Sequence, residues 1–227
     1  MTELVSIVLP VHNQADHIEE VVRQHVDRLA GLNTEHELLL VPNACRDESP
    51  SICARLEREL DSVRSLPLAE GGWGVAVQAG LEAARGDLLC YTNSARTTPE
   101  ELTLLVLYGT IFPEVVVKAN RKVRERLARR VGSLLYNLEC RTLFDLSCWD
   151  VNGTPKVFPR QFGELLRLRS RDDLIDAEFC AVCRKLEYPM VEVPIFSTRR
   201  YGGRSTTSYG SAVRLYSGAY RAWRHGW

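Results

Sequence analysis

Short apolar runs in the first half of the chain end in small polar residues. The runs cover residues 4–11, 37–41 and 88–92, and the polar ends are His12-Asn13, Pro42-Asn43 and Thr92-Asn93-Ser94. Runs of this length are typical of strands buried on both faces. In a parallel sheet, ligands bind beyond the carboxyl ends of the strands, so these amides, hydroxyls and the imidazole predict a hydrogen-bonding site there. Capping of neighbouring turns by Asn13 and Asn43 is the alternative.

The second half carries a different chemistry. Residues 121–142 read as one or two basic helices, and Asp176 and Glu178 begin a helix predicted over 174–186. A carboxylate is the usual general base for a hydroxyl nucleophile, although acidic residues in a first turn also complement the helix dipole. Cys180 and Cys183 have metal-ligand spacing but no second pair, which favours two thiols on a helix.

Helical spacing between the strands predicts an α/β fold. Helices are expected over residues 16–29, 50–60 and 75–84 and from Pro99 onward, and further strands over 115–118 and 191–196. This alternation is typical of a mostly parallel sheet with helices on both faces. The apolar run from Leu102 is interrupted by Gly109 and ends at Pro113, so it is too short to span a bilayer and predicts a core helix.

Composition excludes several classes of protein. Lysine plus arginine and aspartate plus glutamate both number 29 in 227 residues, which argues against a nucleic-acid partner. Seven scattered cysteines and no secretory signal indicate free thiols and a cytoplasmic location. No dinucleotide-binding glycine motif follows the first run and no Walker loop is present. The aromatic, arginine-bearing tail either packs on its own domain or lies on a membrane surface.

An ordered series of motifs resembles family-2 glycosyltransferases. The matching segments in the first half are Ser6–Asn13, Gly72-Trp73-Gly74 with Gly80, Gly86 and Asp87, and Thr98–Leu102. Those in the second half resemble the polyprenyl-phosphate (dolichyl-phosphate) mannose synthase branch: Lys118–Arg121, Arg129 with Ser133 and Asn137, Asp150–Phe158, Glu192–Ile195, and Arg200 with Gly203-Arg204-Ser205. The resemblance covers the chain to about Ser208. It implies a GT-A-like fold, with a nucleotide-sugar half at 1–119, an acceptor half at 120–208, and a C-terminal helix or tail at 209–227.

The sequence departs from the family where a metal is normally held. The family's Asp-x-Asp aligns with Thr92-Asn93-Ser94, so both carboxylates are missing. Mg²⁺ and Mn²⁺ prefer anionic oxygen ligands. We therefore assign no metal ligands, and any Mg²⁺ or Mn²⁺ cofactor would be held weakly or replaced.

The resemblance also assigns roles to individual residues. It implies that the nucleotide-sugar donor contacts Pro10, His12, Asn13, Asn43, Thr92, Asn93, Ser94 and Arg96. It implies that phosphate or acceptor groups contact Arg121, Arg129, Ser133, Arg200, Arg204 and Ser205. Arginines bind phosphate in bidentate fashion and could stabilise a leaving diphosphate without a metal. Arg124, Arg126 and Arg130 read instead as solvated surface charges.

Two functional hypotheses follow from these motifs. The first is an inverting glycosyltransferase that moves a sugar from a nucleotide-sugar to an acceptor. Glu178 or Asp176 would be the base for a hydroxyl acceptor, whereas a lipid phosphate would need none. The second is a binding or accessory protein that kept the fold and lost the chemistry. A peripheral membrane contact fits the lipid-phosphate alternative.

Overall fold

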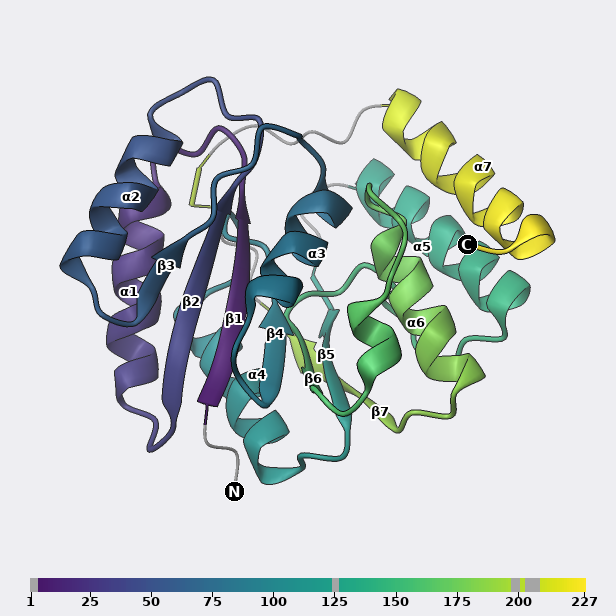
Figure 1. Cartoon of the computed structure of the whole chain (residues 1–227). Coiled ribbons are helices and arrows are strands. Elements are labelled where there is room, and N and C mark those ends of the chain that lie inside the picture. Colours follow the sequence, from purple (N-terminus) through teal and green to yellow (C-terminus); the bar gives the residue numbers. More distant parts are fainter. Residues whose placement is uncertain (1–3, 124–126, 197–200, 203–208) are drawn as a thin grey trace.

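The computed structural model describes residues 4–123, 127–196, 201–202 and 209–227. Within them, seven strands form one sheet in the order β3-β2-β1-β4-β6-β5-β7 (Figure 1). The strands are β1 (Leu4–Val11), β2 (Glu35–Pro42), β3 (Val63–Ser65), β4 (Leu88–Tyr91), β5 (Val116–Arg121), β6 (Lys156–Pro159) and β7 (Met190–Ile195). Strand β6 runs antiparallel to β4 and β5, and the other pairings are parallel.

Helices cover both faces of this sheet. One face packs against α1 (Ile18–Ala30), α2 (Ser49–Glu59) and α4 (Pro99–Ile111). The other packs against α3 (Trp73–Ala83), the 3₁₀ helix η1 (Gly163–Leu166), α5 (Leu127–Phe144) and α6 (Ile175–Lys185). The last helix, α7 (Tyr209–His225), lies along α5 (Figure 1). The predicted α/β fold is confirmed.

Strand β1 lies in the interior of the sheet, between β2 and β4, because it is apolar on both faces. Val5, Ile7 and Leu9 pack among α1, α2 and α4, whereas Val8 packs on the opposite side. On that side α3 approaches the sheet closely at Gly80, where a Cβ atom would lie 2.3 Å from a methyl carbon of Val8. Only glycine permits this approach, which brings the start of α3 to the sheet edge that holds the polar strand ends.

Helix α4 begins as the sequence predicts. Pro99 occupies the first turn, and the Thr98 hydroxyl and the Glu101 carboxylate form a reciprocal capping box with the backbone. Leu102, Leu105 and Val106 are buried in the core, so the apolar run is a core helix. None of the helices in the described part of the chain has both the length and the apolar character that a bilayer crossing requires.

The prediction that the basic helix begins at Arg121 is wrong. Arg121 ends strand β5, where it pairs with Ile195 of β7, and the helix described next begins at Leu127. Parallel pairing with β7, which lies about 70 residues further along the chain, outweighs the local helical pattern. The short strand β3 was also missed, because three residues carry too little periodicity to reveal it.

Candidate functional site

The polar strand ends meet at one edge of the sheet. Val11 is paired with Pro42 across β1 and β2, and Val8 with Tyr91 across β1 and β4. The Asn43 backbone N–H donates to Val11 O over 2.9 Å, and that of Thr92 donates to Val8 O over 3.0 Å. The polar residues that follow the three strands therefore converge, as the sequence predicts. This edge lies at the top of Figure 1.

Asn43 joins three elements at this edge. Its buried side-chain amide donates to Val11 O over 2.8 Å and to Val41 O over 3.2 Å. Its Oδ1 atom accepts the backbone N–H of Gly72, directly before α3, over 3.1 Å. Both amide protons and one lone pair of Oδ1 are thus used within the protein.

His12 and Asn13 form the exposed rim. His12 Nδ1 lies 2.7 Å from Asn43 O, and its Nε2 lies 3.1 Å from the Asn13 side-chain nitrogen. Because a carbonyl can only accept, Nδ1 carries the proton and Nε2 accepts from Asn13. Asn13 adopts a positive φ of 51°, which asparagine tolerates better than most residues. This hydrogen bond orients the imidazole and the amide relative to each other at the exposed edge of the candidate site.

The end of β4 is neutral and tied to its surroundings. Thr92 Oγ1 lies 2.6 Å from Thr97 Oγ1, and Asn93 Oδ1 accepts the backbone N–H of Ala95 over 3.0 Å. Ser94 Oγ lies 2.9 Å from the carbonyl of Pro10.

This donor set does not fit a divalent cation. Mg²⁺ and Mn²⁺ need several oxygen ligands, with carboxylates among them, and the tip supplies only hydroxyls and one amide. Among the described residues, no cluster of three or more histidines, cysteines or acidic residues could hold a metal ion.

Arg96 and Tyr201 also lie at this edge. Arg96 is half-buried just beyond the β4 tip. The Tyr201 backbone N–H donates to Ala95 O over 3.0 Å, so the chain returns from β7 to the β4 tip. Arg200, Arg204 and Ser205, which are neighbours of Tyr201 in the sequence, lie outside the described residues, as does the side chain of Arg129 on α5. Ser133 is half-buried on α5.

The two candidate bases are buried and already bonded. Asp176 forms an ion pair with the fully buried Lys156 and accepts the Tyr91 hydroxyl over 2.9 Å. The negative charge of Asp176 adds to burial in raising the pKa of Tyr91 well above its ordinary value. Asp176 and Glu178 both lie in the first turn of α6, as expected.

Glu178 positions a loop rather than facing an open space. Its two oxygens accept the backbone N–H groups of Arg169 and Ser170 over 2.9 and 2.8 Å. Gln78 of α3 donates to the carbonyl of the same Ser170 over 3.0 Å. The carboxylate thus fixes the loop that lies against the beginning of α3. A catalytic role for Asp176 or Glu178 stays a prediction.

Arg121 belongs to a charged network that joins β5, β7 and the loop before β6. Its guanidinium makes two hydrogen bonds of 2.8 Å with the Asp150 carboxylate. The Asp150 backbone N–H donates to Glu192 over 3.0 Å, and Glu192 pairs with Lys118 over 2.9 Å. The predicted phosphate contact of Arg121 would therefore be made by a guanidinium that Asp150 already orients.

Sequence reasoning missed the importance of the two buried lysines. Lys118 and Lys156 have no exposed surface, and each faces a carboxylate. Burial opposes the charge of Lys118, but the surrounding thiols and carboxylates outweigh it and raise its pKa. Burial also opposes the charge of Glu192, yet Lys118 and two backbone N–H groups lower its pKa. A lysine within an apolar strand was the available signal, because such a residue is seldom buried without a partner.

The sheet and the helices that cover it form a GT-A type of fold. The architecture matches glucosyl-3-phosphoglycerate synthase from Mycobacterium tuberculosis in complex with phosphoglyceric acid, with a TM-score of 0.75 over 97% of this chain and 80% of that chain. The identity is 17%, so this likeness concerns the fold alone.

The chain belongs to glycosyl transferase family 2, whose model matches residues 6–126. It is 33% identical over 192 residues to undecaprenyl-phosphate 4-deoxy-4-formamido-L-arabinose transferase from Pseudomonas fluorescens, covering 83% of this chain and 53% of that protein. It is 30% identical over 205 residues to glycosyltransferase AglD from Haloferax volcanii, covering 84% of this chain and 32% of that protein. The chain thus spans about half the length, or less, of these relatives. The resemblance found in the sequence is confirmed.

Proposed function

We propose that this protein transfers a sugar from a nucleotide-sugar donor to a polyprenyl phosphate, and that it needs no divalent cation. The observation that carries this proposal is the neutral tip of β4, set beside the tips of β1 and β2 in a family-2 fold. Thr92, Asn93 and Ser94 at the β4 tip offer hydroxyl and amide groups that suit a nucleotide, and none of the three is a carboxylate that would suit a metal. The curated relatives support the acceptor class, because one of them is an undecaprenyl-phosphate transferase.

The donor would lie across the strand tips. His12 and Asn13 are exposed and carry both donor and acceptor groups, so the edge can form hydrogen bonds with a base or ribose. The diphosphate would face Thr92, Asn93, Ser94 and Arg96. Arginine charge, from Arg96 and from Arg200 and Arg204 by resemblance, would stabilise the leaving group in place of a cation.

The acceptor phosphate would react without a protein base. A phosphate oxygen attacks the anomeric carbon, the new C–O bond forms, and the bond from that carbon to the nucleoside diphosphate breaks with inversion. The electron pair leaves with the diphosphate. Because the nucleophile is already anionic, no proton has to be removed. This fits the burial of Asp176 and Glu178, whose oxygens are engaged with protein groups.

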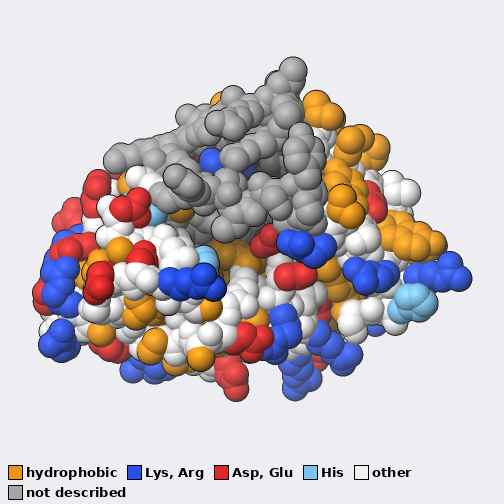
Figure 2. Space-filling model, turned by 90° about the horizontal axis from the view of Figure 1, so that it is seen from above, with side chains coloured by type: hydrophobic (Ala, Val, Ile, Leu, Met, Phe, Trp, Pro, Cys, Tyr) orange, Lys and Arg blue, Asp and Glu red, His pale blue; other side chains and the backbone are white. Residues whose placement is uncertain are grey.

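A membrane contact through α5 and α7 would bring the lipid to the site. Tyr136 and Tyr216 pack edge to face between these helices, with ring centres 5.6 Å apart. Apolar side chains on their outer surfaces stay exposed: Val131, Leu134, Leu135 and Leu138 on α5, and Val213, Tyr220 and Trp223 on α7. Figure 2 shows hydrophobic side chains gathered on the side of the molecule where α7 lies. Basic residues such as Arg221 and Arg224 accompany them, as in helices that lie in a bilayer interface.

A transfer assay tests the catalytic proposal. The 227-residue chain is mixed with UDP- and GDP-sugars and with vesicles that contain undecaprenyl phosphate, with Mn²⁺ or with EDTA. We expect labelled sugar in the lipid fraction at comparable rates in both conditions, and a slower rate for Arg129→Ala. Transfer that requires Mn²⁺, or unchanged turnover in Arg129→Ala, would contradict the metal or phosphate assignment. Nucleotide-sugar binding without transfer would instead support the accessory-protein hypothesis.

Vesicle co-sedimentation tests the membrane contact separately. The double substitution Leu134→Glu and Leu138→Glu should release the protein from anionic vesicles, because each exposed leucine side chain gains a charge that the bilayer repels. Leu104→Glu, on the exposed surface of α4, is the matched control and should sediment like the unmodified protein. Equal sedimentation of all three proteins would refute the α5–α7 surface.

A further inference from the structure

Three thiols line a pocket beside the loop that carries Asp150 of the charged network. The pocket has a volume of about 270 Å³ and lies between the loop after α5, helix α6 and the beginning of β7. Cys148 comes from the loop, Cys180 and Cys183 come from α6, and Met190 adds a fourth sulfur from β7. These cysteines are not needed for the transfer chemistry proposed above.

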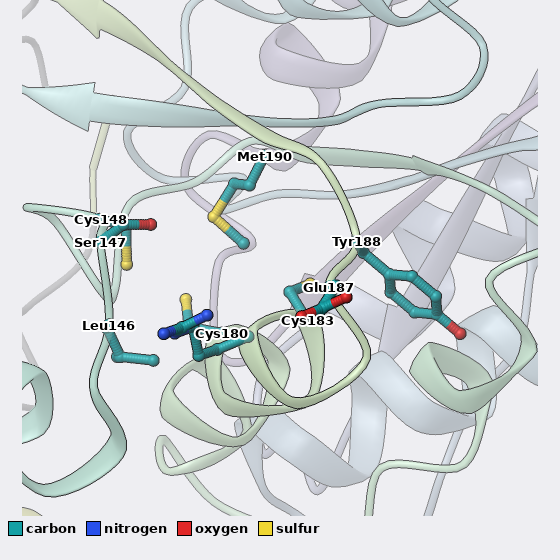
Figure 3. Close-up of a pocket in the computed structure, with 9 residues that line it drawn as sticks. Leu146, Ser147, Cys148, Cys180, Cys183, Glu187, Tyr188 and Met190 are labelled. Carbon is teal, nitrogen blue, oxygen red and sulfur yellow. The ribbon is translucent and has the colours of Figure 1, made fainter.

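Cys148 and Cys180 form the close pair of this group. Their sulfur atoms point toward the same space, while Cys183 lies one turn further along α6 (Figure 3). The Cys180 thiol donates to the carbonyl of Val151, three residues after Cys148, over 3.8 Å. All seven cysteines of the chain are free thiols, so this pair is reduced in the structure.

The surroundings favour a thiolate on Cys148. Interaction with the Cys180 thiol lowers the pKa of Cys148, burial acts in the opposite direction, and the nearby ammonium of Lys118 adds to the lowering. Interaction with Cys148 and burial together raise the pKa of Cys180. Cys148 would thus be the nucleophile and Cys180 the proton-bearing partner, the usual division between an attacking and a resolving cysteine.

We propose that Cys148 and Cys180 are a thiol oxidation site that reacts with hydrogen peroxide and closes to a disulfide. The Cys148 thiolate attacks one peroxide oxygen, so that an S–O bond forms, the O–O bond breaks and hydroxide leaves. The Cys180 sulfur then attacks the sulfenic sulfur, so that the S–S bond forms and the S–O bond breaks. The Cys180 proton leaves in water. The two thiols lose two electrons, which reduce the peroxide to water.

Cys148 is connected to the charged network by the two residues that follow it in the chain. Cys148 precedes Trp149 and Asp150, whose backbone N–H groups bind Glu192, and Asp150 holds Arg121. Linking Cys148 to α6 pulls this loop toward the helix and shifts the carboxylate that orients Arg121. This effect on transfer rests on the proposed function, whereas formation of the disulfide does not.

Peptide mapping of the oxidised protein tests the site. The unmodified chain is treated with hydrogen peroxide, alkylated and digested, and we expect one linked peptide that joins Cys148 to Cys180 and is lost on reduction with dithiothreitol. Cys148→Ser and Cys180→Ser should each abolish it. Cys183→Ser, in the same pocket, should keep it.

Other products would overturn the proposal. A Cys148 thiol that remains fully alkylatable after peroxide, oxidation of Cys148 to sulfinic acid without a link, or a link to Cys183 would each do so. The mapping of the unmodified chain needs no substitution, so poor folding of a variant leaves the result interpretable. If the disulfide forms and no sugar transfer is found under any condition, the oxidation site stands and the proposed function fails.

Discussion

The strand tips of β1, β2 and β4 and the network around Lys118 and Lys156 handle polarity in opposite ways. At the tips, neutral groups form hydrogen bonds with one another and with backbone carbonyls. In the second region, full charges are buried and paired: Lys118 with Glu192, and Lys156 with Asp176. A neutral group can exchange a protein partner for a ligand at low cost, whereas a buried ion cannot lose its partner cheaply. The tips can therefore exchange partners at lower cost than the buried ion pairs, and the ion pairs stabilise the fold.

The largest expected effect comes from breaking the Lys156–Asp176 pair. Lys156→Met leaves the Asp176 carboxylate buried with only the Tyr91 hydroxyl, and such a loss lowers the free energy of unfolding by about 3–5 kcal/mol. Urea denaturation of the variant measures it. Combining Lys156→Met with Asp176→Asn should recover part of the loss, because no unpaired charge remains. If Lys156→Met lowers the free energy of unfolding no more than a surface substitution does, the ion pair does not stabilise the fold.

Restoring carboxylates to the β4 tip should give the next largest effect. Thr92→Asp with Ser94→Asp places two like charges in buried positions, so the variant should be less stable than the unmodified chain without metal. Millimolar Mn²⁺ should then raise its unfolding free energy by about 1–3 kcal/mol, as expected for a ligand that binds only the folded state. Thermal unfolding with and without Mn²⁺ measures this. An equal response of the unmodified chain to Mn²⁺ would mean that its neutral tip already binds the ion.

A smaller effect is expected where the loop held by Glu178 meets α3. In Gly74→Ala the new methyl group would lie 2.2 Å from Ser170 O, so the loop must shift, at a cost of about 1–3 kcal/mol. Gly132→Ala is the matched control, because nothing lies within 4 Å of its Cβ position and alanine favours a helix by about 1 kcal/mol. The midpoints of urea unfolding should therefore move in opposite directions. If both variants lose stability equally, the close approach at Gly74 does not constrain the loop.

The smallest effect concerns the pH dependence of the charged network. The pKa of Glu192 is lowered in the folded protein, against the effect of burial, by Lys118 and the backbone N–H groups that it accepts. A lowered folded pKa contributes stability above the unfolded pKa of about 4.3, and that stability is lost as the pH falls through the folded value. Glu192→Gln should flatten this acid limb of the stability curve. An unchanged slope below pH 4 would place the acid sensitivity at other carboxylates.

Much of the fold follows from local patterns. The apolar runs at β1, β2 and β4 and the capping box before α4 are encoded in neighbouring residues, so their types and approximate limits could be predicted. Arg121 was misplaced because its strand depends on pairing with β7, which the local sequence does not contain. The short β3 depends in the same way on its neighbour β2.

By itself, the sequence determined the family, the alternation of strands and helices, and the convergence of neutral side chains at one edge of the sheet. Only the tertiary structure decided how those side chains are used: Asn43 turned inward to join β1, β2 and α3, Asp176 paired with Lys156, and Cys148 set beside Cys180. These are contacts between residues 20 or more positions apart. Periodicity and motif spacing report which face a residue lies on, whereas the partner of a buried polar group is set by how the elements pack.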